Sequence, residues 1–265
     1  MERRFTFDAI AELYDASRPD YPDALIEQAS LTASLRPGDP VLEIGCGTGK
    51  ATRSFARRGF RVVALEPGAN LLGVARRSLA EFPNIEFIST TFEDWPLEPA
   101  RFKLIFAAQS FHWISPDVQF SKAALALGPG GVLAVFANTV MPLDSPLGDE
   151  IERIYARTAP GLIGNEFARN WYLAGGGLSQ LFDALPEPLG APAHHGYAWS
   201  RSYTAEAYAQ FLCTQSNHQM LPAAQREDLL SQIREAVAAR GGTIVLPFET
   251  HLFTAVRLTV HPPVV

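Results

Sequence analysis

Three glycines at alternate positions form the stretch of this sequence with the clearest chemical meaning. A short apolar run over Pro40–Ile44 predicts a buried strand, and it is followed by Gly45-Cys46-Gly47-Thr48-Gly49. Glycine tolerates positive φ and lets a ligand approach the backbone closely. A glycine loop between a buried strand and a helix is typical of a site for a nucleotide-like ligand at the carboxyl end of a parallel sheet.

The spacing of the loop separates it from two well-known phosphate-binding loops. The dinucleotide fingerprint G-x-G-x-x-G would need a glycine where Lys50 stands. A P-loop would need Ser or Thr after Gly49-Lys50, and Ala51 follows instead. This pattern favours a ligand without a pyrophosphate. A dinucleotide site is the weaker alternative, which binding of NADH would reveal.

An acidic residue stands at the end of the next expected strand. Arg61–Leu65 predicts that strand, and Glu66 follows it, 21 residues after Gly45. A carboxylate there can accept hydrogen bonds from both ribose hydroxyls of an adenosine. Taken alone, Glu66 is equally well explained as a solvated acid at a strand end. The glycine loop at this spacing favours the ribose role.

The elements that must position these residues alternate along the chain. Apolar runs predict strands at 40–44, 61–65, 85–88, 102–107 and 132–136, with helices at 48–58, 69–80 and 117–127. Two helices, at 7–14 and 22–35, precede them, and the turn at 127–131 closes the helix before the strand at 132–136. Further helices are expected at 147–157, 178–185, 204–212 and 221–240, and strands at 197–203 and 245–258.

This alternation indicates a doubly wound α/β fold with a mostly parallel, seven-stranded sheet. We expect a single domain over residues 1–265. It comprises N-terminal helices at 5–35, a core at 36–140, a small helical cap-like insertion at 141–190, and C-terminal helices and strands at 191–260.

Composition narrows the class of protein. The chain has 265 residues, a formal net charge of −6 and no long run of one sign, so it lacks the basic footprint of a nucleic-acid-binding protein. It has two cysteines, Cys46 and Cys213, in no metal-ligand spacing, and we expect no metal. No signal-peptide core or membrane-spanning apolar stretch is evident, which predicts a cytoplasmic protein without a membrane partner. Nothing in the sequence indicates the oligomeric state.

These motifs resemble those of the class I S-adenosylmethionine (SAM)-dependent methyltransferases. Residues 43–49 resemble the first motif of the family and residues 64–67 the second. The closest resemblance is to bacterial enzymes of the methyltransferase type 11 group, which are related to trans-aconitate methyltransferase, and it covers residues 5–140 well. It implies a Rossmann-like methyltransferase fold, SAM as cofactor and S-adenosylhomocysteine (SAH) as product.

The resemblance also assigns roles to residues. It places the glycine loop against the amino-acid part of SAM, Glu66 on the ribose and Glu43 near the amino group of the ligand. In the third motif, Thr91 stands where many members carry an acid that contacts the adenine, Phe92 supplies a backbone N–H and an apolar face, and Glu93 is one step removed. The expected cofactor-binding residues are Tyr14, Arg18, Glu43, Gly45, Cys46, Gly47, Gly49, Glu66, Pro67, Phe92, Glu93, Ala108 and Gln109.

Residues 107–114 resemble the fourth motif, an AxxxHW loop at the edge of the sheet. The resemblance sets Ala108 or Gln109 beside the methionine part of SAM, and places His112 and Trp113 towards the substrate. His112 is the candidate base for a phenol, hydroxyl or amine acceptor, whereas a carboxylate needs no base. Arg18, on a leading helix that covers the site, is expected to touch SAM or an acidic substrate. Arg169 and Arg201 are weaker candidates for binding such a substrate.

We therefore expect a methyltransferase acting on a small molecule, with carboxylic acids the first class to test. Two alternatives stay open. One is a methyltransferase of protein or RNA, which the negative charge and the lack of an Asn/Asp-Pro-Pro-aromatic run disfavour. The other is a non-catalytic SAM-binding protein, which tight binding without turnover would reveal.

Overall fold

A single seven-stranded sheet organises the described part of the chain. The computed structural model describes residues 7–162, 171–173 and 175–259. Within them the strands follow the order β3-β2-β1-β4-β5-β7-β6. Their bounds are β1 Pro40–Ile44, β2 Arg61–Leu65, β3 Ile85–Ile88, β4 Phe102–Ala108, β5 Leu127–Val140, β6 Ala193–Thr204 and β7 Thr243–Val256. The pairs from β3 to β5 are parallel, and β7 runs antiparallel to both β5 and β6. The predicted doubly wound, mostly parallel fold is confirmed.

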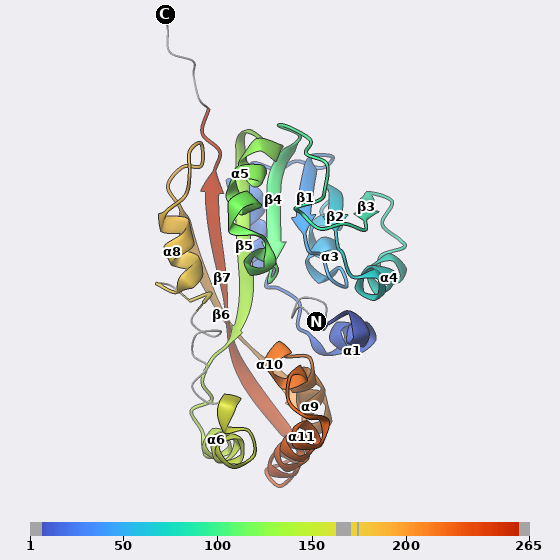
Figure 1. Cartoon of the computed structure of the whole chain (residues 1–265), viewed down its shortest axis with the longest axis vertical. Coiled ribbons are helices and arrows are strands. Elements are labelled where there is room, and N and C mark those ends of the chain that lie inside the picture. Colours follow the sequence, from blue (N-terminus) through green and yellow to red (C-terminus); the bar gives the residue numbers. More distant parts are fainter. Residues whose placement is uncertain (1–6, 163–170, 174, 260–265) are drawn as a thin grey trace, which may run out of the picture.

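Helices cover both faces of this sheet (Figure 1). One face packs against α2 (Asp23–Thr32), α3 (Lys50–Ala56) and α4 (Ala69–Ser78). The other packs against α5 (Pro116–Ala126) and α8 (Gly177–Asp183). Central strands are therefore apolar on both sides. In β1, Val41 enters the first core, while Leu42 and Ile44 enter the second.

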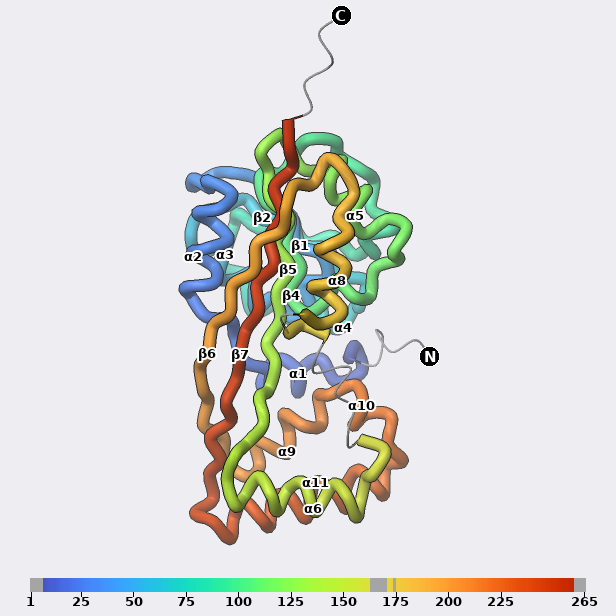
Figure 2. The backbone as a smooth tube through the Cα atoms, turned by 90° about the vertical axis from the view of Figure 1, so that its left-hand side faces the viewer, coloured from blue at the N-terminus to red at the C-terminus, as the bar shows by residue number. Residues whose placement is uncertain are grey.

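The last three strands of the sheet extend well beyond its parallel part, as the elongated trace in Figure 2 shows. At their far end a third apolar cluster joins Tyr203 of β6 and Phe248 of β7 to the helices α6 (Pro146–Thr158), α9 (Ala205–Cys213) and α11 (Ala223–Ala238). The short α10 (Ser216–Gln219) follows α9. The sequence predicts one helical cap over residues 141–190. In the structure, α6 from that range packs with α9 and α11, whereas α8 from the same range packs on the sheet.

Two local details refine the sequence reading. The turn expected at 127–131 is part of β5, where a register shift between Phe102 and Leu104 of β4 absorbs the extra residues. The leading helical segment is split into η2 (Asp8–Ile10) and α1 (Ala11–Ser17). Among the helices described here, none combines the length and the apolar character needed to cross a bilayer.

Candidate active site

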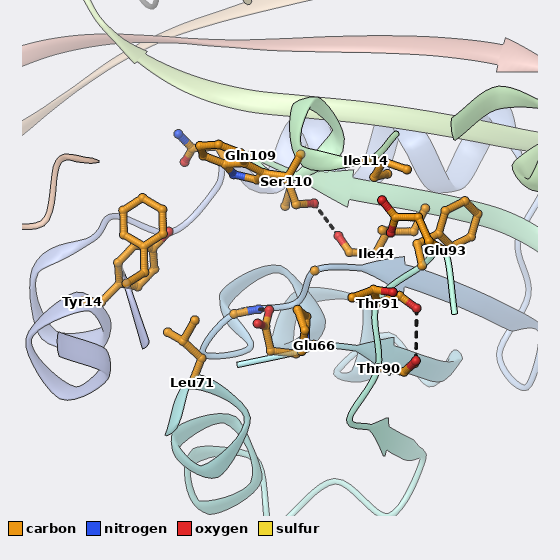
Figure 3. A pocket seen from close by; sticks show the side chains of 17 residues that line it. Tyr14, Ile44, Glu66, Leu71, Thr90, Thr91, Glu93, Gln109, Ser110 and Ile114 are labelled. Atoms are coloured by element: carbon orange, nitrogen blue, oxygen red, sulfur yellow. Dashed lines mark hydrogen bonds between the residues drawn. The ribbon is translucent and has the colours of Figure 1, made fainter. Parts of the chain in front are cut away.

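A pocket lies at the carboxyl ends of β1, β2 and β4, where the strand order reverses between β1 and β4. Ligands of open α/β sheets bind at such a reversal. Figure 3 shows Tyr14 and Glu93 at opposite ends of the pocket, with Glu66 on one wall and Gln109 and Ser110 on the other. The pocket is lined by Phe7, Tyr14, Ile44, Gly45, Gly47, Glu66, Pro67, Leu71, Thr90, Thr91, Phe92, Glu93, Ala108, Gln109, Ser110, Trp113 and Ile114.

A second, more polar recess continues from this pocket on the α3 side of the glycine loop. It shares Tyr14, Gly45, Gly47, Ala108 and Gln109 with the first. Its other lining residues are Arg18, Pro19, Tyr21, Glu43, Cys46, Thr48, Lys50 and Ala51. The two recesses therefore form one elongated site that passes over the glycine loop.

The loop can pass this close to a ligand because it is built from glycine. Gly45, Gly47 and Gly49 have φ values of +68°, +57° and +86°. A Cβ atom at Gly45 would come within 2.7 Å of the Ser110 Cβ. Ser110 in turn donates a hydrogen bond from its Oγ to the carbonyl oxygen of Ile44. The end of β1 and the loop after β4 are thus held together, and no side chain fits between them.

Glu66 stands on the wall of the pocket with its carboxylate fixed by backbone N–H groups. The Gly47 N–H donates to its Oε2 and the Gly68 N–H to its Oε1, each at 2.8 Å. Burial raises the pKa of Glu66, and these two hydrogen bonds oppose the rise. Each carboxylate oxygen keeps a further lone pair. The group can therefore accept two hydroxyl donors on its pocket side.

Glu43, in the second recess, is 1% exposed and accepts a hydrogen bond from the Thr52 hydroxyl of α3. Burial raises its pKa to about 8, the Thr52 hydrogen bond opposes this, and the negative charge of Glu66 adds to it. Two carboxyl groups thus share a poorly solvated region, and within the described residues no cation is bonded to either. Such a region favours a ligand that brings a positive charge.

The end of the pocket near β3 combines an apolar face with a carboxylate. Phe92 is buried and stacks on Trp95 with ring centroids 6.2 Å apart. Glu93 accepts a hydrogen bond from the Ser115 backbone N–H at 3.0 Å. Thr91, which occupies the expected position of an acid, has its hydroxyl bonded to Asp94 at 2.8 Å. Glu93 is therefore the carboxylate that faces this end of the pocket.

The segment from η2 to α1 covers the site from outside the sheet. Asp8 accepts hydrogen bonds from the first backbone N–H groups of α4, Asn70 at 2.8 Å and Leu71 at 3.0 Å. At the other end of the segment, the Arg18 guanidinium donates to the Thr214 carbonyl oxygen at 2.6 Å, just after α9. Tyr14 lies between these two anchors. Contacts with α4 on one side and with the end of α9 on the other therefore fix its place over the pocket.

The loop after β4 carries local backbone strain. Gln109 has a φ of +56°, which is unfavourable for a residue with a Cβ. Its side-chain oxygen accepts a hydrogen bond from the Tyr21 hydroxyl at 3.3 Å, and its backbone N–H donates to the Phe136 carbonyl at 2.9 Å. In this conformation the Gln109 side chain lies within hydrogen-bonding distance of Tyr21 at the edge of the site.

His112 and Trp113 belong to η3 (Phe111–Trp113), directly after this loop. Trp113 lines the pocket, whereas His112 is not among the described lining residues of either recess. His112 instead hydrogen-bonds the Tyr172 hydroxyl through its Nδ1. Of the weaker candidates, Arg201 stacks on Tyr203 of β6 at 4.9 Å, and Arg169 lies outside the described residues.

Apart from Gly49, every residue expected to bind the cofactor lines one of the two recesses. Gly49 instead precedes α3, where a Cβ would meet Leu79 at 2.6 Å. Sequence reasoning missed Lys50, Thr48, Tyr21 and Asp8. The only available signal was for Thr48 and Lys50, which stand inside and directly after the glycine loop. Lys50 lies 3.8 Å from both Asp15 and Asp20.

Comparison with known proteins agrees with this geometry. The sequence model of a family described as a methyltransferase domain matches residues 41–131, the segment that holds the loop, Glu66 and the β4 motif. An uncharacterised methyltransferase of Mycobacterium tuberculosis is 28% identical over 250 residues, covering 92% of this chain and 93% of the relative. These matches support a class I SAM-dependent methyltransferase.

Solved structures place this methyltransferase in the same fold. It superposes on a methyltransferase structure from Anaeromyxobacter dehalogenans with a TM-score of 0.60 at 26% identity, covering 92% of this chain and 99% of the other. A phosphoethanolamine N-methyltransferase of Haemonchus contortus, solved with SAM, gives a TM-score of 0.55 at 15% identity and covers 98% of this chain and 60% of the other. A trans-aconitate 2-methyltransferase of Afipia carboxidovorans is 36% identical over 99 residues, which is 36% of this chain and 37% of that one.

Proposed function

We propose that this methyltransferase binds SAM along the two recesses and transfers its methyl group to a small-molecule acceptor. The Glu66 carboxylate carries the proposal, because it stands at the end of β2 with acceptor sites free for the two ribose hydroxyls of SAM. The adenine then lies between Phe92 and Ile114, with Glu93 accepting from its amino group. The methionine part enters the second recess, beside Glu43 and Lys50.

The second recess fits a ligand that carries both an amino group and a carboxylate. The hydroxyl of Thr48 is buried, and no partner for it exists among the described residues. A buried polar atom without a partner is costly, and a bound carboxylate would satisfy this one. Lys50, on the same wall, supplies a positive charge for that carboxylate, and Glu43 supplies an acceptor for the amino group.

For the acceptor, we propose an acidic small molecule and no nucleic-acid or membrane partner. The Afipia relative is named for a tricarboxylic acid, trans-aconitate, and its match covers about a third of this chain. The fold alone does not choose the acceptor, since the neighbours also include a structure described as a [4+2]-cyclase, at 15% identity and a TM-score of 0.54. A cytoplasmic location remains part of the proposal.

The cofactor assignment is tested by calorimetric titration of SAH into Glu66→Ala. We expect its affinity to fall about 10- to 100-fold, since hydrogen bonds to a charged group contribute roughly 1.5–3 kcal/mol. Glu81→Ala, an exposed acid after α4, is the matched control and should bind as the wild type does. Equal affinity in the two variants, with both folded by circular dichroism, would remove Glu66 from the site.

The acceptor is tested by measuring SAH formation from SAM with a panel of small carboxylic acids, phenols, alcohols and amines. Turnover of small molecules supports the proposal. SAH formation only with added protein or RNA would replace it with a macromolecular methyltransferase. Tight SAM binding with no turnover in any of these mixtures would indicate the non-catalytic alternative.

A further inference from the structure

His112 and Tyr172 form a hydrogen-bonded pair beside the pocket that the cofactor assignment leaves unused. Their rings meet edge to face, with centroids 5.6 Å apart and planes at 80°. Tyr172 belongs to the apolar core cluster under α5 and α8 and is 8% exposed. Residues on both sides of His112 line the pocket, namely Ser110, Trp113 and Ile114. A buried core residue therefore holds the His112 ring next to the site.

The burial of Tyr172 decides which partner donates the hydrogen. Burial raises the pKa of Tyr172 well above its usual range, so its hydroxyl stays protonated. Its bond to His112 is the one hydrogen bond that this hydroxyl makes among the described residues. A hydroxyl that only accepted here would keep its hydrogen unpaired in a buried place, which is costly. The Tyr172 hydroxyl therefore donates to the Nδ1 of His112.

This direction of donation fixes the tautomer of a neutral imidazole. Because Nδ1 accepts, the single ring hydrogen resides on Nε2. His112 as a whole residue is partly open to solvent, although the protein that packs against one side of its ring desolvates it. The protein packed around the ring lowers the pKa of His112, and no neighbouring carboxylate raises it. At pH 7 the side chain is a hydrogen-bond donor.

Two tyrosines that line the site, Tyr14 and Tyr21, also carry hydroxyl groups that can donate hydrogen bonds. Tyr14 is close enough to Tyr172 to raise the pKa of its hydroxyl, and both of these tyrosines raise the pKa of Tyr21. Burial keeps Tyr21 protonated. A histidine that acts as a general base is usually oriented by a carboxylate that stabilises its charged form, and no carboxylate of the described residues is hydrogen-bonded to His112. Glu43, the acid of the second recess, is hydrogen-bonded to Thr52 of α3.

We propose that Tyr172 locks His112 as an Nε2–H donor that holds an acceptor oxygen already deprotonated in solution, which selects carboxylates as the methyl acceptors. This assignment rests on the proposed function and replaces the sequence-based role of His112 as a base. In the reaction, a lone pair of the carboxylate oxygen forms the new bond to the methyl carbon of SAM. The bond from that carbon to sulfur breaks, and its electrons remain on sulfur. The products are a methyl ester and SAH, and no proton is released.

The tautomer is measured directly by long-range ¹H–¹⁵N correlation on protein labelled at histidine. His112→Gln assigns the His112 signals among the six histidines. We expect a neutral ring with its hydrogen on Nε2 at pH 7, and a mixture of tautomers in Tyr172→Phe. Tyr197→Phe, which also loses one hydroxyl but lies on β6, should leave the signals unchanged. An Nδ1–H tautomer or a charged ring at pH 7 would overturn the proposal.

Turnover separates a donor from a base. With carboxylates as acceptors, we expect less than one-tenth of a proton released per SAH formed, and His112→Gln, which keeps an N–H donor, should retain more activity than His112→Ala. Turnover confined to phenols, alcohols or amines, with one proton released per SAH, would overturn the proposal. SAH titration into the same variants should show unchanged affinity. If the wild-type protein did not bind SAH, the proposed cofactor site would be refuted, whereas the tautomer result would still stand.

Discussion

The buried carboxyl group of Glu43 should make the free energy of unfolding depend on pH. Glu43→Gln should abolish the contribution of this group to the pH dependence. Glu43 is 1% exposed, and its pKa rises from 4.5 to about 8 on folding because burial disfavours the charged form. The folded state therefore holds the proton more tightly than the unfolded chain. Stability from this group is full below pH 4.5 and is lost as the pH rises through about 8.

The size of the effect follows from that shift. Over its whole range the rise corresponds to about 5 kcal/mol, at roughly 1.4 kcal/mol per tenfold change in proton affinity. Between about pH 5.5 and 7.5, the wild type should lose roughly 2–3 kcal/mol more of its free energy of unfolding than Glu43→Gln does. The glutamine keeps the volume of the side chain and an oxygen that accepts from Thr52.

Urea unfolding of both proteins at several pH values provides the assay. Each pH gives a difference between the two free energies of unfolding, and contributions from other titrating groups largely cancel. The difference should change in favour of the variant as the pH rises. Parallel pH profiles for the two proteins would show that Glu43 titrates normally in the fold, and would refute the inference that its surroundings exclude water.

Two further predictions concern the parts that frame the site. Gly45→Ala should lower the free energy of unfolding by about 1–3 kcal/mol more than Gly130→Ala, measured by urea unfolding. Both positions have positive φ, but only at Gly45 does the new Cβ meet another atom, the Ser110 Cβ at 2.7 Å. A similar loss in both would mean that the loop can move aside. Asp8→Ala should lower the free energy of unfolding by about 0.5–2 kcal/mol, because α4 loses its cap. It should also speed SAH release in stopped-flow fluorescence, because Tyr14 loses one anchor; an unchanged release rate would contradict its covering role.

Much of the parallel half of the fold could be predicted because it is determined by residues that are close together in the sequence. The apolar runs predicted β1 to β4 within one residue, whereas β5 extends four to five residues beyond the predicted run at both ends. The glycine loop and Glu66 stand directly after the runs that form β1 and β2. The helix expected at 204–212 likewise begins at a local signal, because the Thr204 hydroxyl accepts a hydrogen bond from the Ala207 N–H at 3.2 Å and caps α9. In such cases the residues that determine the structure are neighbours in sequence.

The remaining features depend on contacts between distant residues. Asp8 caps a helix that begins more than sixty residues later, and Tyr172 reaches His112 across sixty positions. Strand pairing of β6 with β7 extends over twelve residues and builds the support for α6, α9 and α11. No local pattern in those helices indicates which of them share a core. The shared core of α6, α9 and α11 and the hydrogen bond between His112 and Tyr172 could therefore be found only in the structure.

Titration of SAH into the wild-type protein, with NADH as a comparison ligand, shows whether this pocket binds SAM. We expect saturable one-to-one binding of SAH and no binding of NADH, because Glu66 and Thr48 suit a nucleoside joined to an amino acid and the loop lacks the pattern for a pyrophosphate. Absence of SAH binding, or binding of NADH in its place, would contradict the assignment of this pocket to SAM.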